Sequence, residues 1–358
     1  MFTIDRNTII YIFCPAGAVT GGPEALHQLC DAVNMQGGKA KMVYVDYGTE
    51  QIVRAGKPLP YKAYYTRSTT EVIDDARHIA IVPEIWPHLL GKYHRLQKGL
   101  WWLSVNYLRN PDIFEKKEFF HLYQSVYAGN FLQSKGIPVA FPLFDYLKIP
   151  FRKIELAGKR PQVCYNPKKG FEVTQKVIES MGNRDITFFA LSGLSKKELA
   201  KALAESKVYI DFGDHPGKDR IPREAVMAGN IVITSRNGSA AFFEDLPIEA
   251  KYKLERDRIT AICAAVEAAV AGYATAHTDF DYYRRVVRGQ KREFFNQCRS
   301  VFLQGNYRFS RKLTGLLVFK LLPLNFLFLN AEMMKNKVIK MLSPSTKRRI
   351  RKLIGTHE

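Results

Sequence analysis

The segment KVYIDFGDHPGKDRIPREAVMAGNIVITSRNGSAAFF, which begins at Lys207, constrains the fold more than any other part of the sequence. Val208–Phe212 and Ile231–Thr234 are short runs of β-branched and aromatic residues, typical of parallel strands that are covered on both faces. Three helix signals lie between them: Pro222 for a first helical position, Glu224–Ala228 for the helix and Gly229 for its end. The segment therefore predicts a β-α-β unit and a fold of the α/β class.

The loop of this unit is expected to bind an anion. It leaves the carboxyl end of a strand, where open α/β sheets bind ligands, and the next helix presents unpaired N–H groups there. Lys218, Arg220 and Arg223 add positive charge, so the pattern predicts a phosphorylated ligand. Glu224 has two interpretations: it accepts hydrogen bonds from hydroxyls of a sugar or ribose, or it only stabilises its own helix.

The segment runs in the order strand, charged loop, Pro-x-Glu-Ala-x-x-Ala-Gly, second strand and Gly-Ser-Ala. This order resembles the donor-binding segment of GT-B glycosyltransferases, especially the retaining family four. The resemblance implies that Glu224 holds the ribose of a nucleotide-sugar donor. In that family an acidic residue eight positions upstream contacts the transferred sugar, but Pro216 occupies this position here. Either Asp214 or His215 is expected to substitute for it, and Arg220 is the cation expected to stabilise the leaving group.

A second strand, glycine-containing loop and helix opens the chain, at Thr8–Phe13, Pro15–Pro23 and Glu24–Val33. The glycines of this loop do not form GxGxxG, and Pro-Glu stands where a P-loop requires Lys and Ser or Thr. Neither a dinucleotide-binding fold nor a P-loop NTPase is therefore supported. The resemblance implies that Gly21 and Gly22 face the donor's phosphates, whereas the alternative is that they only allow a tight turn.

Strand-like and helix-like runs continue through the first half of the chain and predict a doubly wound parallel sheet. The expected strands are Ala40–Asp46, His78–Glu84, Lys98–Val105, Leu122–Tyr127 and Val139–Leu143, with a helix at Gly129–Lys135. Glu84, His88 and His94 lie at or after a strand end and are further catalytic candidates. A lone histidine in such a place is more often a surface or packing residue.

A basic, turn-prone boundary at Leu156–Pro161 precedes a new strand, loop and helix at Gln162–Tyr165, Asn166–Gly170 and Phe171–Met181. The resemblance implies that Lys168 and Lys169 in this loop neutralise the donor diphosphate; the alternative is that both are solvated surface lysines. The remaining expected elements are a strand at Asp185–Leu191, a capping box at Ser195–Glu198 that opens a helix to Glu205, and helices at Arg258–Ala271 and Phe280–Phe302.

The sequence thus predicts a GT-B architecture of two Rossmann-like domains, residues 1–157 on the acceptor side and 158–305 for the nucleotide-sugar, followed by a basic tail of residues 306–358. The implied activity is transfer of a glycosyl group from a nucleoside-diphosphate sugar to a hydroxyl of a glycan or lipid-linked acceptor, in bacterial surface polysaccharide assembly. Neither a metal ion nor a cofactor is expected. The alternative is a catalytically inactive GT-B-like binding module at the membrane surface.

The net charge of +20 on 358 residues implies an acidic partner. Residues 306–358 hold twelve Lys and Arg against two Glu, and within them Leu313–Phe328 is strongly apolar but interrupted by Lys320, Pro323 and Asn325. An interfacial helix, with Lys347–Lys352 on anionic headgroups, is expected, with domain packing or a true span as alternatives. Binding of nucleic acid is not expected, because no recognised motif accompanies the charge.

The cysteines are far apart and form no CxxC pair, which argues against both a zinc site and a disulfide framework. The first residues do not resemble a secretory signal. We therefore expect a cytoplasmic protein at the inner face of the cell membrane.

Overall fold

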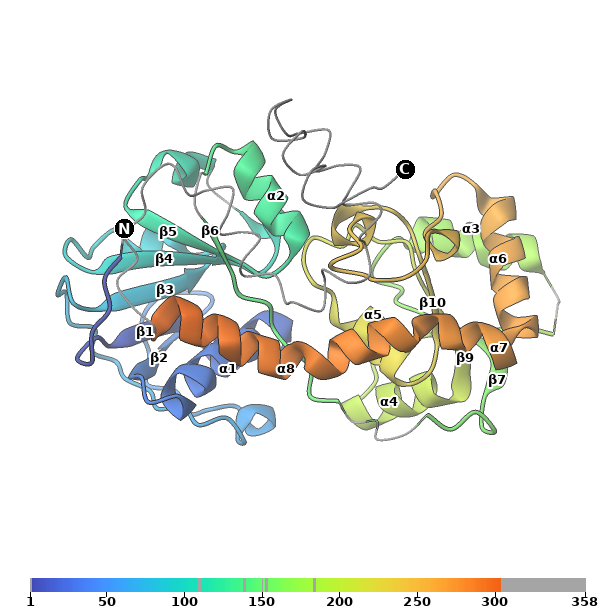
Figure 1. Ribbon diagram of the computed structural model, residues 1–358, viewed down its shortest axis with the longest axis horizontal. Coiled ribbons are helices and arrows are strands. Elements are labelled where there is room, and N and C mark those ends of the chain that lie inside the picture. Colours follow the sequence, from blue (N-terminus) through green and yellow to red (C-terminus); the bar gives the residue numbers. More distant parts are fainter. Residues whose placement is uncertain are drawn as a thin grey trace, which may run out of the picture. The chain divides into compact units, whose positions relative to one another are not determined.

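Two parallel β-sheets form the framework of the computed structural model, which describes residues 2–108, 111–137, 140–149, 151, 154–182 and 185–303 (Figure 1). The first sheet has the strand order β2-β1-β3-β4-β5-β6 and the second the order β10-β9-β7-β8. All neighbouring strands within each sheet are parallel. The predicted α/β class with two Rossmann-like sheets is therefore confirmed.

The strands of the first lobe, the unit around the first sheet, are β1 Ile10–Pro15, β2 Ala40–Val45, β3 Ile79–Pro83, β4 Gln97–Trp102, β5 Phe119–Tyr123 and β6 Ala140–Pro142. The strands of the second lobe are β7 Arg160–Tyr165, β8 Thr187–Ala190, β9 Ser206–Asp211 and β10 Ile231–Thr234. The helices are α1 Gly21–Met35, α2 Val126–Ser134, α3 Phe171–Met181, α4 Lys196–Glu205, α5 Arg220–Met227, α6 Ile259–Ala271, α7 Tyr273–Ala276 and α8 Asp281–Phe302.

The central strands are buried on both faces, as their apolar composition predicts. Every residue of β1, β3 and β10 is buried. In the second lobe α3 contacts α6, and α4 contacts α5, so the helices pair in layers around the sheet. The predicted capping box at the start of α4 is confirmed, since Ser195 and Glu198 exchange the two reciprocal hydrogen bonds.

Both site helices begin earlier than the sequence predicts. Helix α5 begins at Arg220, so Pro222 is its third residue and not its first. Helix α1 begins at Gly21, which places Gly21 and Gly22 inside its first turn. Pro23 and Pro222 are each the third residue of their helix. A proline fits there, because the N–H groups of a first turn have no partner within the helix. The tight-turn interpretation of these two glycines is wrong, and the left-handed conformation lies instead at Gly17, with φ 70°.

The first lobe also departs from the predicted alternation of strands and helices. Strand β5 ends at Tyr123, because Ser125 caps α2 by accepting a hydrogen bond from the Ala128 amide at 3.1 Å. Within the described residues, the connections from β2 to β5 contain short 3₁₀ turns and no α-helix. The chain there is rich in turn residues such as Pro58 and Pro60.

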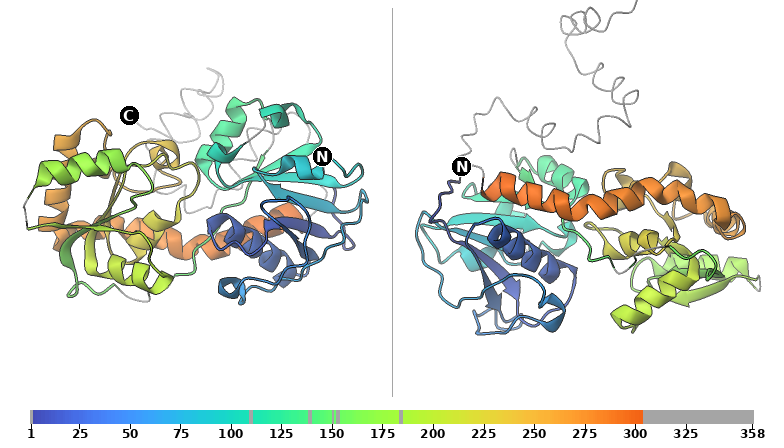
Figure 2. Two further views of the ribbon diagram at one scale, coloured as in Figure 1. Left: turned by 180° about the vertical axis from the view of Figure 1, so that it is seen from behind. Right: turned by 60° about the horizontal axis from the view of Figure 1, so that its bottom comes forward.

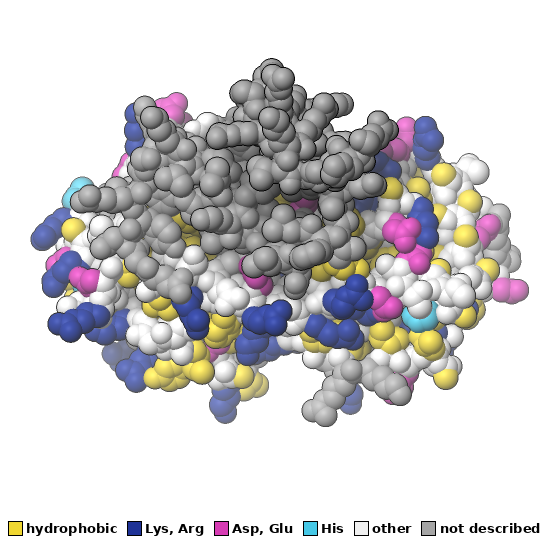
Figure 3. All heavy atoms as spheres, in the orientation of Figure 1, with side chains coloured by type: hydrophobic (Ala, Val, Ile, Leu, Met, Phe, Trp, Pro, Cys, Tyr) yellow, Lys and Arg dark blue, Asp and Glu magenta, His cyan; other side chains and the backbone are white. Residues whose placement is uncertain are grey.

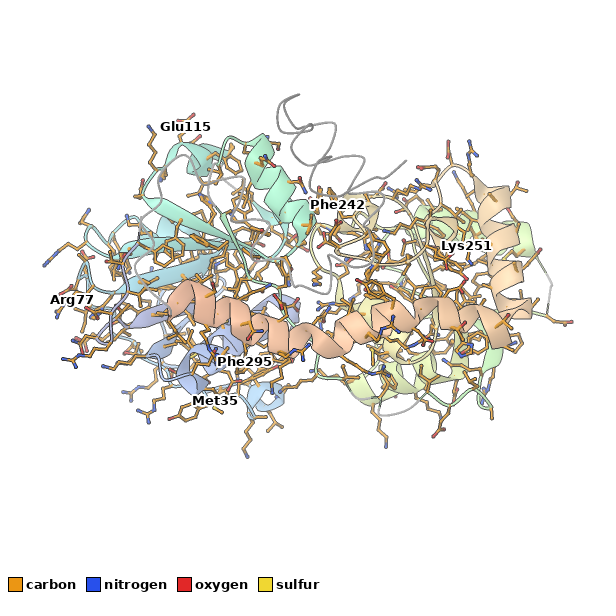
Figure 4. The ribbon with its side chains drawn as sticks, in the orientation of Figure 1. Met35, Arg77, Glu115, Phe242, Lys251 and Phe295 are labelled. Carbon is orange, nitrogen blue, oxygen red and sulfur yellow. The ribbon has the colours of Figure 1, made fainter. Side chains whose placement is uncertain are left out.

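Helix α8 contacts α5 of the second lobe and α1 of the first lobe (Figures 1 and 2). At its C-terminal end, Phe295 accepts a hydrogen bond from the Gln36 side chain at 3.1 Å, just beyond Met35 at the end of α1 (Figure 4). The aromatic ring of Phe294 stacks on Trp101 of β4. The last helix therefore returns from the second lobe to the first.

Arg223 of α5 is the buried anchor at this junction, with no exposed surface. Its guanidinium bonds to the Asp145 carboxylate at 3.1 Å and to the Gln290 amide oxygen at 3.2 Å. It also donates to the backbone carbonyls of Lys218 and Asp219, at 2.8 and 3.0 Å. Arg223 thus joins the site loop, the linker after β6 and α8, and its charge is not available to a ligand.

No single helix of the described chain is long and apolar enough to cross a bilayer; α6 passes that test only jointly with the helical segment after it, across a bend of 85°. All five cysteines lie in the described residues, all are buried, and none forms a disulfide there. The apolar run Leu313–Phe328 and the basic run Lys347–Lys352 lie outside the described residues, as does the whole predicted tail.

Replacement of Arg223 by Ala is expected to reduce the free energy of unfolding by about 3–5 kcal/mol, because it leaves the Asp145 carboxylate buried without its counter-ion. The matched control is Arg236→Ala, since the side chain of Arg236 is 51% exposed. Urea denaturation of both variants measures the effect. Equal stability of the two variants would show that Arg223 does not anchor the junction.

Candidate functional site

The site lies where the strand order of the second sheet reverses. β7 is the first strand of this sheet in the chain, and it pairs with β8 on one side and β9 on the other. In open α/β sheets, such a switch point leaves a crevice at the carboxyl ends of the strands. The loop after β7 carries Lys169, and the loop after β9 leads to α5. Both predicted binding loops therefore meet at the place where this fold binds ligands.

Two glycines let the loops around the site pack closely. Gly170 has φ 57°, and a Cβ atom there would lie 2.3 Å from the carbonyl oxygen of Phe212. Gly238 has φ 55°, and its Cβ would lie 2.2 Å from the carbonyl oxygen of His215. Only glycine fits both the left-handed conformation and these distances. The Gly-Ser-Ala sequence after β10 thus holds the loop after β9, and Ser239 adds a hydrogen bond to the Gly217 carbonyl at 2.6 Å.

A chain of four side chains, two of them buried and two partly buried, crosses this loop. The ammonium of Lys169 donates to both carboxylate oxygens of Asp219, each at 2.9 Å. His215 Nδ1 lies 2.8 Å from Oδ2 of the same carboxylate, and His215 Nε2 lies 3.6 Å from Asp211 Oδ1. Asp211 is fixed in turn by the hydroxyl of Tyr209 at 2.7 Å. The order Lys169, Asp219, His215, Asp211 therefore alternates cations and anions.

The charges of this chain stabilise one another. Burial opposes a charge on His215, but the hydrogen bond to Asp219 and the charges of Asp211 and Asp219 outweigh it and raise the pKa of His215. Burial likewise disfavours ionised Asp219, yet His215 and Lys169 hold its pKa below the usual range. His215 therefore favours the protonated imidazolium, bridging two carboxylates. Its backbone has φ 45°, a left-handed conformation that non-glycine residues adopt seldom.

Asp211, His215 and Asp219 also present one ligand-type atom each within 4.8 Å of one another. In this arrangement hydrogen bonds already use those atoms, because Lys169 lies on both oxygens of Asp219 and the Gly213 amide donates to Asp211 at 3.0 Å. A cation would have to displace the ammonium. The geometry is thus that of a hydrogen-bonded chain.

Arg220, the first residue of α5, forms an ion pair between the lobes. Its guanidinium lies 2.7 Å from the carboxylate of Glu24 in α1 and 3.7 Å from that of Glu224. Glu24 is buried and also accepts a hydrogen bond from the Tyr64 hydroxyl at 2.8 Å. The Arg220 side chain passes Gly21, where an added Cβ would lie 3.1 Å from its Cδ atom. The first turns of α1 and α5 thus face each other across this pair.

Further contacts join the same loops. The Val105 amide donates to the carbonyl of Pro216 at 3.0 Å, and a Cβ on Gly217 would collide with the carbonyl oxygen of Leu103. Asp245 accepts the amides of Val126 and Tyr127 at the start of α2, at 2.8 and 2.9 Å. Beside it, Phe242 packs on the Tyr127 ring (Figure 4). The loop after β9 is therefore held from both lobes.

Among the predicted site residues, the structure brings together Lys169, His215, Arg220, Glu224 and Gly21. Glu224 is partly buried, and burial raises its pKa although Arg220 opposes the shift. Gly22 lies against Leu103, two residues before Val105, which contacts Pro216. These residues line the two helix starts and the loops after β7 and β9.

The structure does not bring the other predicted residues into this group. Lys168 is exposed beside Lys169. The side chain of Asp214 is 69% exposed and pairs with Arg256 at 3.3 Å. Lys218 is buried with its ammonium 4.8 Å from the Phe144 ring, and burial lowers its pKa to about 8. The Lys218 side chain therefore packs against Phe144 of the linker after β6.

Asp211, Asp219 and Glu24 belong to the site but were not singled out by the sequence, whereas His215 was. Asp211 and Asp219 lie four residues before and four residues after His215, and this spacing was a visible signal for the chain of side chains. Glu24 gave no such signal, because its partner Arg220 is remote in sequence. Only the fold places them together.

The remaining catalytic candidates of the first lobe lie outside this group. Glu84 is buried and accepts the Leu103 amide at 2.9 Å; burial raises its pKa to about 7. His88 is exposed and pairs with Glu50 at 2.6 Å. His94 is exposed on the surface. Glu84 thus supports the loop that contacts the second lobe.

The raised pKa of His215 predicts a pH-dependent stability. A group whose pKa is higher in the folded state stabilises it below the unfolded value, here 6.5, and this contribution is lost as the pH rises through the folded value. The stability difference between the wild type and His215→Gln should fall above pH 6.5, by up to about 1.4 kcal/mol per pH unit. Denaturation across this pH range measures it. A difference that stays flat or grows with pH contradicts the imidazolium bridge.

Comparisons with known proteins fit this architecture. No protein-family model and no curated protein sequence matches the chain. Among solved structures, the sucrose-phosphate synthase of Thermosynechococcus elongatus is 14% identical with a TM-score of 0.58, and a glycosyltransferase of Rickettsia africae is 12% identical with 0.60. The pneumococcal O-GlcNAc transferase GtfA, solved with UDP and GlcNAc, is 10% identical with 0.57. Each alignment covers 82% of this chain and 98% of the other, and the chain therefore has the GT-B fold that these glycosyltransferases share.

Proposed function

We propose that the protein is a glycosyltransferase that moves a sugar from a nucleoside-diphosphate sugar to a hydroxyl group. The observation that carries this proposal is the convergence of Lys169, Arg220 and the start of α5 at the switch point of the second sheet. Ammonium, guanidinium and helix N–H groups are the donors that a diphosphate requires. Structures with the same fold were solved with UDP or UDP-glucose bound, which is consistent with such a donor.

The chemistry depends on stabilising the leaving group. When the bond between the sugar and the diphosphate breaks, negative charge develops on the phosphate oxygen. The hydrogen bonds from Lys169 to Asp219 and from Arg220 to Glu24 fix both cations in place. Lys has three donor hydrogens and Arg five, so donors remain for the phosphates. Asp219 and Glu24 would thus position the cations before the donor arrives.

The roles of the remaining residues follow from their exposure. Glu224 is partly buried one turn into α5, and we assign it to the hydroxyls of the donor ribose. His215 is buried between two carboxylates, so a role in fixing Asp219 suits it better than abstraction of an acceptor proton. We propose that the reaction needs no metal ion or cofactor, since Lys169 lies where a cation would bind Asp219.

The acceptor is proposed to be a glycan or lipid-linked sugar used in surface polysaccharide assembly. A lipopolysaccharide outer core galactosyltransferase, WaaB, has the same fold at 8% identity and a TM-score of 0.57. The net charge of +20 supports a cytoplasmic location against an anionic membrane surface. The basic and apolar sequence of residues 306–358 supports the same location.

A second candidate is a binding module without transferase activity. Pro216 occupies the position at which the resembled family has an acidic residue, and its carbonyl bonds to the Val105 amide. Assays of transfer and hydrolysis against a panel of nucleotide-sugars separate the two functions. A binding module would bind a donor and leave it intact.

Replacement of Glu224 by Ala, or of Arg220 and Glu24 together by Ala and Gln, is expected to reduce glycosyl transfer by about 10²–10³-fold. The double variant removes both charges of this partly buried pair, so neither charge is left without its partner and we expect the fold to be retained. Arg77→Ala, an exposed arginine of the first lobe, is the control. Initial rates with the donor found in the panel give the measurement. Folded variants as active as Arg77→Ala would exclude these residues from the donor site.

A further inference from the structure

A hollow of about 440 Å³ lies between α1, the linker after β6 and α8. We call it the linker pocket. Its charged and aromatic lining consists of Asp31, Tyr64, Tyr146, Lys148, Arg288 and Lys291. This volume is within the range of pockets that bind small molecules. None of these six residues belongs to the site proposed for the donor.

The linker pocket has an excess of positive charge. Lys148, Arg288 and Lys291 face a single carboxylate, Asp31, which already accepts the Tyr65 amide at 2.7 Å. Among the described residues, none of these three cations has a carboxylate within 4.0 Å. These three cations therefore form no ion pair among the described residues.

Burial and neighbouring cations lower the pKa of Lys148. Partial burial lowers its pKa first, Lys196 and Lys291 lower it further, and Glu24 and Asp31 oppose the shift. Lys and Arg side chains gather over α8 on the face of the molecule that Figure 3 shows. The exposed cations of this helix are Arg285, Arg288, Lys291, Arg292 and Arg299. A bound anion would relieve this repulsion.

Two tyrosine rings flank the cations. The ammonium of Lys148 lies 3.7 Å from the ring centroid of Tyr64, and that of Lys291 lies 5.8 Å from the ring of Tyr146. Such cation–π contacts hold the lysine side chains against the wall of the pocket. The cations are thus placed beside apolar surface that can cover an organic group.

Tyr64 also separates the linker pocket from the donor site. Its ring lines the pocket, while its hydroxyl donates to Glu24, the partner of Arg220. The Gln28 amide reinforces this wall by donating to the Tyr146 carbonyl at 2.7 Å. A ligand in the pocket would therefore be a different molecule from the donor at Arg220.

We propose that the linker pocket binds the phosphate group of a second ligand, either a soluble phosphorylated molecule or the headgroup of an anionic phospholipid. The phosphate oxygens accept hydrogen bonds from Lys148, Arg288 and Lys291, and the tyrosine rings cover the attached organic part. Both sources offer the same phosphate chemistry. The inference does not depend on glycosyl transfer, because it concerns binding alone.

The test compares the full-length wild type with the triple variant Lys148→Gln, Arg288→Gln, Lys291→Gln. A charge-matched control replaces Lys116, Lys117 and Lys176, three exposed lysines outside the pocket, by Gln. One arm titrates glycerol 3-phosphate by calorimetry. The other measures sedimentation with phosphatidylglycerol vesicles, with phosphatidylcholine vesicles as reference. Residues 306–358 are present in all three proteins, so their contribution cancels.

We expect the triple variant to bind at least about tenfold more weakly than both the wild type and the control variant. A loss with glycerol 3-phosphate identifies a soluble ligand, and a loss confined to vesicles identifies a lipid headgroup. The double variant of Arg220 and Glu24 should retain this binding, which distinguishes it from donor binding. Equal affinities of the triple and control variants, or no binding by the wild type in either arm, overturn the proposal.

Discussion

The pairing of each site cation with a carboxylate is the interaction on which the rest of the site depends. Asp219 holds Lys169, and Glu24 holds Arg220. With His215 protonated, the site has three cations, namely Lys169, His215 and Arg220. Its carboxylates are four: Asp211, Asp219, Glu24 and Glu224. The proposed affinity for a diphosphate therefore rests on directed donors and the start of α5, and not on net charge. Fixed donors of this kind need little reorganisation when charge develops.

The fold supplies the positions of these pairs through contacts that are distant in sequence. Arg223 ties α5 to the linker and to α8, and α8 returns to the first lobe beside α1. The start of α1 then presents Glu24 to Arg220. The ion pair between Arg220 and Glu24 thus joins the two lobes, and a donor bound at Arg220 would contact both of them.

Much of the fold was predictable because its signals are local. The strand Ile231–Thr234 and the capping box of α4 depend on neighbouring residues only. Which lysine side chains can reach a ligand could not be predicted in this way. Lys169 and Lys218 look equivalent in the sequence, but Phe144 covers Lys218, whereas Asp219 holds Lys169 at the crevice. Such differences arise from tertiary contacts that composition and periodicity do not encode.

The most direct test of this account is a crystal structure of the protein with a bound nucleoside-diphosphate sugar. The account predicts that the diphosphate lies within hydrogen-bond distance of the Lys169 ammonium and the Arg220 guanidinium, at the start of α5, with the ribose hydroxyls on Glu224. A donor bound elsewhere, with Lys169 still turned to Asp219 and no phosphate at Arg220, would contradict it.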